Sequence, residues 1–171
     1  MQAGQQQVKR RLGYRKFASP PYRFLILKYD YFLQRQLVTE LRRQGHEVVE
    51  LQPPPDPSAE AVLNHVLDRA TSFRPDAVVT LNNMGLDQRG AIMRALSDVG
   101  LPVIVWYVDN YRFTGPYLTG PGPEMTIVFC SDRAQVPLLG NAGFAHAFYL
   151  PLAADPGYGA IPRDERYDFL S

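Results

Sequence analysis

Apolar and polar positions alternate along this chain in two different rhythms. Short apolar runs rich in Val, Ile, Leu and Phe are typical of strands, and the stretches between them repeat apolar residues every three or four positions, as helices do. The runs begin about 20 to 30 residues apart, which is the length of one strand with its crossover helix. The strands expected from this pattern are residues 24–27, 48–51, 77–81, 103–108, 126–130 and 147–150.

Turn and cap signals separate the helical stretches from the runs. Gly45 and Gly100 each follow a helical stretch, as expected of residues that adopt positive φ freely. Ser58 is placed to cap the helix that follows it, and the proline-rich connector 53–57 is compatible with neither a helix nor a central strand. The stretch 110–124, rich in Gly and Pro, is predicted to be a long surface loop.

The alternation of strand and helix patterns predicts the fold class. It indicates a Rossmann-like three-layer α/β/α sandwich with a mainly parallel sheet of about six strands. The run 103–108 is almost continuously apolar, as expected of a strand buried on both faces, and is the candidate for the centre of the sheet.

Ligands of open α/β sheets bind beyond the carboxyl ends of the strands, where the strand order reverses. If that reversal lies between the first and fourth strands, the crevice is lined by Lys28-Tyr29-Asp30-Tyr31 and by Tyr107-Val108-Asp109-Asn110. Asn82-Asn83 and Ser131-Asp132 would then stand at its rim. The polar residues of four separate runs therefore gather on one edge of the sheet.

Each of these polar residues also has a structural interpretation. Asp109 follows six apolar residues, and a carboxylate there either caps the next turn, pairs with an arginine or does chemistry. Asn82-Asn83 could form a turn with left-handed backbone geometry. Lys28 and Asp30 could pair with each other, and Ser131 could cap a short helix.

The sequence lacks the motifs of several known functional classes. The first strand-to-helix turn, residues 28–32, contains no glycine, so the dinucleotide-binding fingerprint is absent where it would be needed. The chain also has no phosphate-loop, His-Glu-x-x-His or Gly-x-Ser-x-Gly motif. His46, His65 and His146 have no ligand-like spacing. The sequence therefore predicts neither a metal site nor a cofactor.

The single cysteine, Cys130, excludes an internal disulfide and fits a reducing, cytoplasmic compartment. Its place within the fifth apolar run favours a small buried apolar side chain, and no base for a nucleophilic role can be identified.

The near-neutral net charge of +1 conceals an asymmetry. Residues 1–23 carry six basic and no acidic side chains, which leaves 12 basic and 17 acidic side chains, a net charge of −5, on the rest. Residues 1–21 are expected to form a solvated basic extension, although such a tail could also touch nucleic acid or an anionic membrane. The rest shows no basic face, so no nucleic-acid partner is expected, and no apolar run suits a signal peptide or a membrane span.

Several stretches resemble the N-terminal half of glycosyltransferases related to the spore-maturation protein CgeB. The first is Arg74-Pro75-Asp76 with the apolar run up to Asn82, followed by Gly100-Leu101-Pro102-Val103. The more telling stretches are Trp106-Tyr107-Val108-Asp109 and the later Leu152-Ala153-Ala154-Asp155-Pro156. The resemblance extends over roughly residues 22–170.

The resemblance implies a transferase of the GT-B type, in which two Rossmann-like domains face each other. Residues 22–157 would be the acceptor-side domain, and residues 158–171 a linker with the truncated start of a second, nucleotide-sugar-binding domain. The complete enzyme would transfer a sugar from a nucleotide donor to an acceptor hydroxyl without an obligatory metal, whereas this chain alone would be inactive. Asp109 would be the general base, and the acceptor-binding residues would be Lys28, Tyr29, Asp30, Asn82, Asn83, Asn110 and Ser131.

Other functions remain open at this point. A retaining member of the family may need no base, and Asp109 would then only orient the acceptor. The chain could instead be a non-catalytic ligand-binding or partner-docking module, or a nucleotide-binding regulator. An excised half would expose its interdomain face and could dimerise through it.

Overall fold

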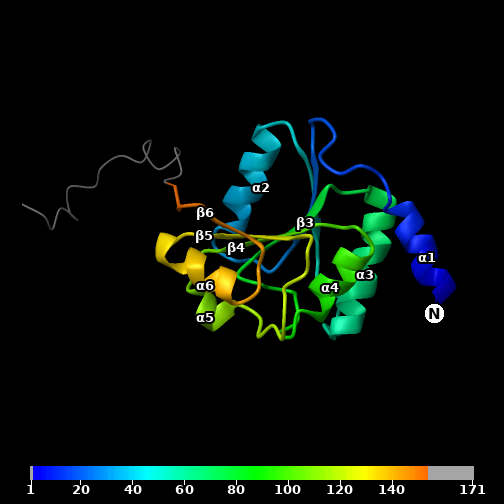
Figure 1. The fold of residues 1–171 in the computed structure, drawn as a ribbon. Helices are drawn as coiled ribbons and strands as arrows, with labels where there is room; N and C mark the ends of the chain where they lie inside the picture. Colours follow the sequence, from blue (N-terminus) through cyan, green and yellow to red (C-terminus); the bar gives the residue numbers. More distant parts are fainter. Residues whose placement is uncertain (1, 154–171) are drawn as a thin grey trace, which may run out of the picture.

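The computed structural model describes residues 2–153 of the chain, which fold around one parallel sheet (Figure 1). The six strands are β1 (Arg23–Leu27), β2 (Glu47–Leu51), β3 (Ala77–Leu81), β4 (Val103–Tyr107), β5 (Thr126–Cys130) and β6 (His146–Tyr149). They correspond to the six apolar runs, so the Rossmann-like α/β fold expected from the sequence is confirmed. The expected start of a second domain, residues 158–171, lies outside the described residues.

One helix precedes the first strand, and the other helices connect successive strands. They are α1 (Gln2–Arg11), α2 (Gln34–Arg43), α3 (Ala59–Phe73), α4 (Ala91–Asp98), α5 (Tyr111–Thr114) and α6 (Val136–Asn141), with a 3₁₀ turn at Arg133–Gln135 before α6. Ser58 caps α3 as predicted, since its side chain accepts a hydrogen bond from the backbone N–H of Ala61 at 3.3 Å. Gly45 and Gly100 follow α2 and α4 with φ of 85° and 75°. The expected loop 110–124 holds one short helix, α5.

The strand order is β2-β1-β3-β4-β5-β6, and every pairing is parallel. The order therefore reverses between β1 and β3. The expectation that the first and fourth strands are neighbours is wrong, because β3 lies between them. The crevice predicted at the reversal point is consequently flanked by the segments that follow β1 and β3, while the segment after β4 lies one strand further along.

Two separate cores pack on the two faces of the sheet. The larger core contains buried residues of α3, α4 and α6, together with Tyr107 and Phe144. The smaller core contains Phe24, Ile26, Ala77 and Val79 of the sheet with Val38 of α2. Figure 1 accordingly shows α2 on one side of the sheet and α4 and α6 on the other. The two helical layers thus differ in size, because α2 covers one face of the sheet while α3, α4 and α6 cover the other.

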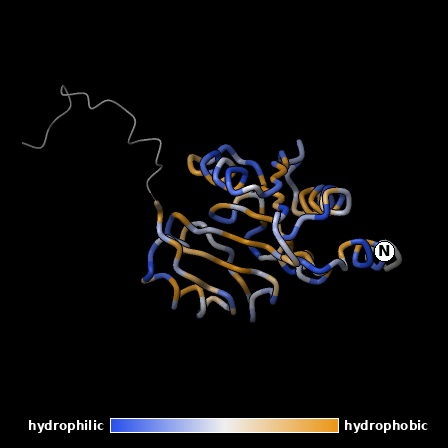
Figure 2. The backbone as a smooth tube through the Cα atoms, turned by 90° about the horizontal axis from the view of Figure 1, so that it is seen from above, coloured by the Kyte–Doolittle hydropathy of each residue, from blue (hydrophilic) through white to orange (hydrophobic). Residues whose placement is uncertain are grey.

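Strand β4 is one of the two central strands, but this inequality corrects its expected burial on both faces. All five residues of β3 are buried, whereas Ile104 and Trp106 of β4 are only partly buried. Their side chains lie on the face that bears α2, and the smaller core reaches only as far as Ile104. The same face continues over Ile127 and Phe129 of β5, both partly buried, to Phe148 of β6, which is 50% exposed. The strands themselves are largely hydrophobic along their length (Figure 2).

The N-terminal extension is not solvated throughout. Leu12 is fully buried in the larger core, and Val8 of α1 packs against that core. The buried carboxylate of Asp76 accepts hydrogen bonds from the backbone N–H groups of Phe17 at 2.7 Å and Arg23 at 2.8 Å. Because these contacts join residues more than 50 positions apart, they fasten the extension to the start of β1 and to the turn before β3.

Candidate functional site

Three side chains from separate loops meet beyond the carboxyl ends of the strands, and we call them the Asp109 cluster: Tyr31, Asn82 and Asp109. The Tyr31 hydroxyl donates a hydrogen bond to Asp109 Oδ2 at 2.6 Å, and Asn82 Nδ2 donates to the same oxygen at 2.8 Å. Asn82 Oδ1 accepts from the backbone N–H groups of Val108 at 3.0 Å and Asp109 at 3.1 Å. Asn82 therefore holds both the backbone and the carboxylate of Asp109.

The backbone after β3 explains how Asn82 reaches this position. Asn82 and Asn83 have φ of 49° and 63°, in the left-handed region that asparagine tolerates better than most residues. The turn is closed by a hydrogen bond from the Thr80 hydroxyl to the carbonyl oxygen of Met84 at 2.6 Å. The interpretation of Asn82-Asn83 as a left-handed turn is thus confirmed. The same turn also places the Asn82 side chain against β4.

Asp109 is an exposed residue at the carboxyl end of β4. It neither caps the next turn nor pairs with an arginine in the part of the chain that the structure describes. Asn110 is the cap of α5, since its Oδ1 accepts from the backbone N–H of Arg112 at 3.0 Å. Within residues 2–153, both side chains that donate to the Asp109 carboxylate reach Oδ2, which leaves Oδ1 free for a ligand.

The hydroxyl of Tyr31 remains a donor at neutral pH. Desolvation raises its pKa above the usual value of tyrosine, and the hydrogen bond to Asp109 and the charge of that carboxylate raise it further. Burial likewise raises the pKa of Tyr29. An ionised Tyr31 would face the Asp109 carboxylate with a second negative charge, so the neutral hydroxyl is the form that stabilises the cluster.

Several other predicted site residues do not join the cluster. Asn83 is 3% exposed, and both polar atoms of its side chain lack hydrogen-bond partners among the described residues. Ser131 donates its hydroxyl hydrogen bond to the carbonyl oxygen of Val108 at 2.9 Å. The expected helix cap at Ser131 is wrong, because Asp132 caps the 3₁₀ turn. Tyr107 is fully buried on the side of the larger core, so it does not line the crevice.

Lys28 and Asp30 follow β1 and lie beside α2, whereas the Tyr29 side chain packs against the larger core on the other face of the sheet. Lys28 Nζ lies 3.8 Å from Asp30 Oδ1, which agrees with the expected mutual pair. The backbone N–H of Tyr29 donates to Gln34 Oε1 at 3.0 Å, and the Tyr29 ring lies against Gly85. Within the described residues, Tyr31 is hydrogen-bonded to Asp109, whereas Lys28 and Asp30 make no hydrogen bond to it.

Lys28 and Asp30 instead line a cavity of about 380 Å³ beside α2. Sequence reasoning missed its other polar residues, Gln34, Arg35, Arg42 and Glu50. Their spacing offered a signal, because positions 35, 38, 39 and 42 form one side of a helix. These helix positions alone do not predict a cavity, because the cavity forms only through the way α2 lies against β2.

Cys130 and the acidic and histidine side chains form no further candidate site within residues 2–153. Cys130 is fully buried, as predicted, and burial raises the pKa of its thiol. In residues 2–153 no group of three or more His, Cys, Asp or Glu side chains is placed to hold a metal ion. No described helix is long and apolar enough to cross a membrane.

Comparisons with known proteins give little guidance to function. No protein-family model and no curated protein matches this chain. One solved structure that it resembles is the iron-containing alcohol dehydrogenase from Thermococcus thioreducens in a tetragonal crystal form, with 19% sequence identity and a TM-score of 0.31. That match covers 74% of this chain and 33% of the dehydrogenase, so the chain spans about a third of that protein.

Proposed function

We propose that this domain holds the acceptor in a sugar-transfer reaction and that Asp109 is hydrogen-bonded to the acceptor hydroxyl. The observation that carries the proposal is the fixed carboxylate of Asp109. One of its oxygens is held by Tyr31 and Asn82, and the other has no partner within residues 2–153. The stretch Trp106 to Asp109, on which the resemblance to CgeB-like transferases largely rests, ends at this carboxylate.

The chemistry assigned to Asp109 is that of a general base. The acceptor oxygen bonds to the anomeric carbon of a nucleotide sugar, and the bond from that carbon to the phosphate oxygen breaks. The electron pair leaves with the nucleotide, and the hydroxyl proton passes to Asp109 Oδ1. Tyr31 and Asn82 keep the carboxylate in place by donating to Oδ2. Oδ1 can therefore accept a hydrogen bond from the acceptor hydroxyl while both of these hydrogen bonds remain.

The donor would be held outside this domain. The turn after β1 has no glycine and therefore offers no close backbone approach for a diphosphate of the kind found in dinucleotide-binding folds. This supports a division of labour in which residues 22–153 contribute the acceptor side and another domain contributes the nucleotide sugar. The domain itself is then expected to bind nucleotide sugars weakly or not at all.

Measuring sugar transfer by the protein tests the proposal. Replacing Asp109 by Asn keeps the size of the side chain and removes the base, so kcat is expected to fall by about 10²- to 10⁴-fold. Asp98→Asn is the matched control, because Asp98 is an exposed residue that ends α4 and the charge change is the same. A kcat for Asp109→Asn within a factor of about two of the control would remove Asp109 from this role.

A second candidate function is a non-catalytic ligand-binding module. The cavity beside α2 favours it, because three cationic side chains and only two carboxylates line this cavity, and Asp109 is not among its lining residues. If the natural protein transfers no sugar from any nucleotide donor while the cavity binds a ligand, the module replaces the transferase as the function of the domain.

A further inference from the structure

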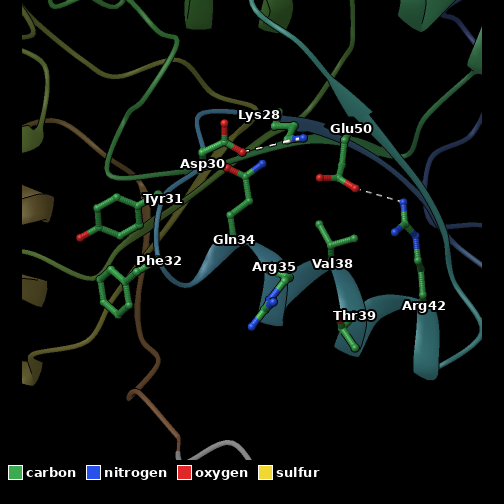
Figure 3. Close-up of a pocket in the computed structure, with 10 residues that line it drawn as sticks. All are labelled: Lys28, Asp30, Tyr31, Phe32, Gln34, Arg35, Val38, Thr39, Arg42 and Glu50. Atoms are coloured by element: carbon green, nitrogen blue, oxygen red, sulfur yellow. Dashed lines mark hydrogen bonds and ion pairs between the residues drawn. The ribbon is translucent and has the colours of Figure 1, made fainter.

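The cavity of about 380 Å³ beside α2, which we call the α2 cavity, falls within the usual size range of small-molecule sites. Its wall combines the segment after β1, one side of α2 and Glu50 of β2 (Figure 3). Its lining residues are Lys28, Asp30, Tyr31, Phe32, Gln34, Arg35, Val38, Thr39, Arg42 and Glu50.

Gln34 leaves a buried hydrogen-bond donor without an acceptor at this cavity. The residue is 5% exposed, and its Nε2 has no partner in the described part of the chain. The orientation of the amide is fixed, because Oε1 accepts the hydrogen bond from Tyr29 N. Figure 3 shows the amide group turned toward Lys28 and Asp30. A buried donor left in this way is unfavourable, and a ligand that accepts from it removes that penalty.

The start of α2 adds a second feature that favours an anion. Leu33 stands at the N-cap position and makes no side-chain cap, and the first turn of the ten-residue helix contains no acidic residue. The partial positive charge of the helix N-terminus is therefore left without a carboxylate from the helix itself. The two features are independent, since one is a side-chain amide and the other is the backbone of the helix.

The charged side chains of the wall leave one cation in excess. Lys28 pairs with Asp30 at 3.8 Å, and Arg42 pairs with Glu50 at 3.3 Å. Arg35 makes no ion pair with another residue of the described range. The wall thus supplies donors for an anion from Lys28, Gln34 and Arg35, while the carboxylate of Glu50 can accept hydrogen bonds from hydroxyl groups.

We propose that the α2 cavity binds a small phosphate monoester that carries hydroxyl groups, of the sugar-phosphate class. The phosphate takes the donors of Arg35, Lys28 and Gln34 Nε2 near the N-terminus of α2. The hydroxyl groups donate to Glu50, whose carboxylate would repel a second anionic group. A phosphate suits the site because its three terminal oxygens can each accept from one of these donors. This site does not depend on the proposed role of Asp109.

Calorimetric titration of the 171-residue chain with glucose 6-phosphate, inorganic phosphate and glucose tests the proposal. We expect saturable binding of glucose 6-phosphate, weaker binding of inorganic phosphate and none of glucose. Arg35→Gln, a change at an exposed side chain, is expected to weaken glucose 6-phosphate binding at least tenfold. Arg43→Gln is the matched control, since it removes the same charge from the same helix outside the cavity and is expected to leave the Kd unchanged.

Gln34→Glu provides a second variant for the same site. It keeps an oxygen to accept from Tyr29 N and replaces the unpaired donor by an anionic oxygen, so binding of glucose 6-phosphate should be lost while the circular dichroism spectrum stays unchanged. The proposal is overturned if glucose 6-phosphate shows no saturable binding, or if Arg43→Gln weakens binding as much as Arg35→Gln. Equal affinity for inorganic phosphate and glucose 6-phosphate would overturn the assignment of the hydroxyl groups.

Discussion

The Asp109 cluster and the α2 cavity share Tyr31 but differ in how far the chain itself satisfies their polar groups. In the cluster, each polar side-chain atom of Asn82 makes a hydrogen bond, and Asp109 Oδ2 receives two. In the cavity, Gln34 Nε2 has no acceptor and Arg35 no ion-pair partner within residues 2–153. The cluster is therefore built to fix one carboxylate, whereas the cavity leaves donors for a ligand.

This difference teaches which substitutions should affect folding and which should affect binding. A group that other parts of the fold depend on is expensive to remove, even where it also contributes to function. A group that makes no contact within the chain can be removed with little loss of stability. The two regions should consequently separate when stability and binding are measured on the same variants.

Asn82→Ala should produce the largest loss of stability among the polar residues of the two regions. It deprives the N–H groups of Val108 and Asp109 of their acceptor and places alanine at a φ of 49°. We expect the free energy of unfolding to fall by roughly 2–4 kcal/mol, measured by urea denaturation. Arg35→Gln should change it by less than about 0.5 kcal/mol.

Asn82→Gly separates the two contributions to this loss. Glycine adopts the left-handed backbone without strain. The difference between the losses of unfolding free energy in Asn82→Ala and Asn82→Gly therefore measures the backbone strain, and the loss in Asn82→Gly measures the hydrogen bonds. If Arg35→Gln destabilised the domain as much as Asn82→Gly, the contrast between the two regions would be wrong.

The contrast also marks what the sequence could and could not predict. The strands were predictable because their apolar residues follow one another in short runs. The carboxyl edge was predictable as well, so Asp109 and Asn82, 27 residues apart, were correctly placed on one edge of the sheet. The strand order was not predictable from the sequence, because it depends on the edge of β1 at which β3 pairs after the crossover through α3. The same alternation of polar and apolar residues fits either order.

The α2 cavity and the burial of Leu12 were missed for a related reason. Both depend on how closely a helix or segment lies against the sheet, which is set by packing among residues distant in the sequence. Gln34 illustrates this, because a glutamine in the first turn of an amphipathic helix is typical of a solvated residue. It is buried at 5% exposure because the segment after β1 folds back over it, as its hydrogen bond with Tyr29 N shows.

Tyr31→Phe should give a smaller effect that depends on pH. The folded state holds the Tyr31 hydroxyl neutral and raises its pKa, so its contribution to stability is complete below the pKa of an unfolded tyrosine, about 10, and is lost as pH rises through the folded value. The wild-type chain should therefore be slightly more stable than Tyr31→Phe at pH 8, and the difference should disappear in more alkaline solution.

Urea denaturation of both chains at a series of pH values measures this difference, and the other tyrosines titrate alike in both. Equal stability of the two chains at pH 8 would mean that the hydrogen bond from Tyr31 to Asp109 does not stabilise the folded state. A difference that is constant up to pH 11 would mean that folding does not raise the pKa of Tyr31.

The side-chain amide resonances of Gln34 and Asn82 test the contrast between the two regions most directly. In a two-dimensional ¹H–¹⁵N NMR titration with glucose 6-phosphate, the account predicts a saturable shift of the Gln34 Nε2 resonance, because its donor gains an acceptor. The Asn82 Nδ2 resonance should stay in place, because its donor is already held by Asp109 at 2.8 Å. A titration in which Asn82 shifts and Gln34 does not would contradict the account.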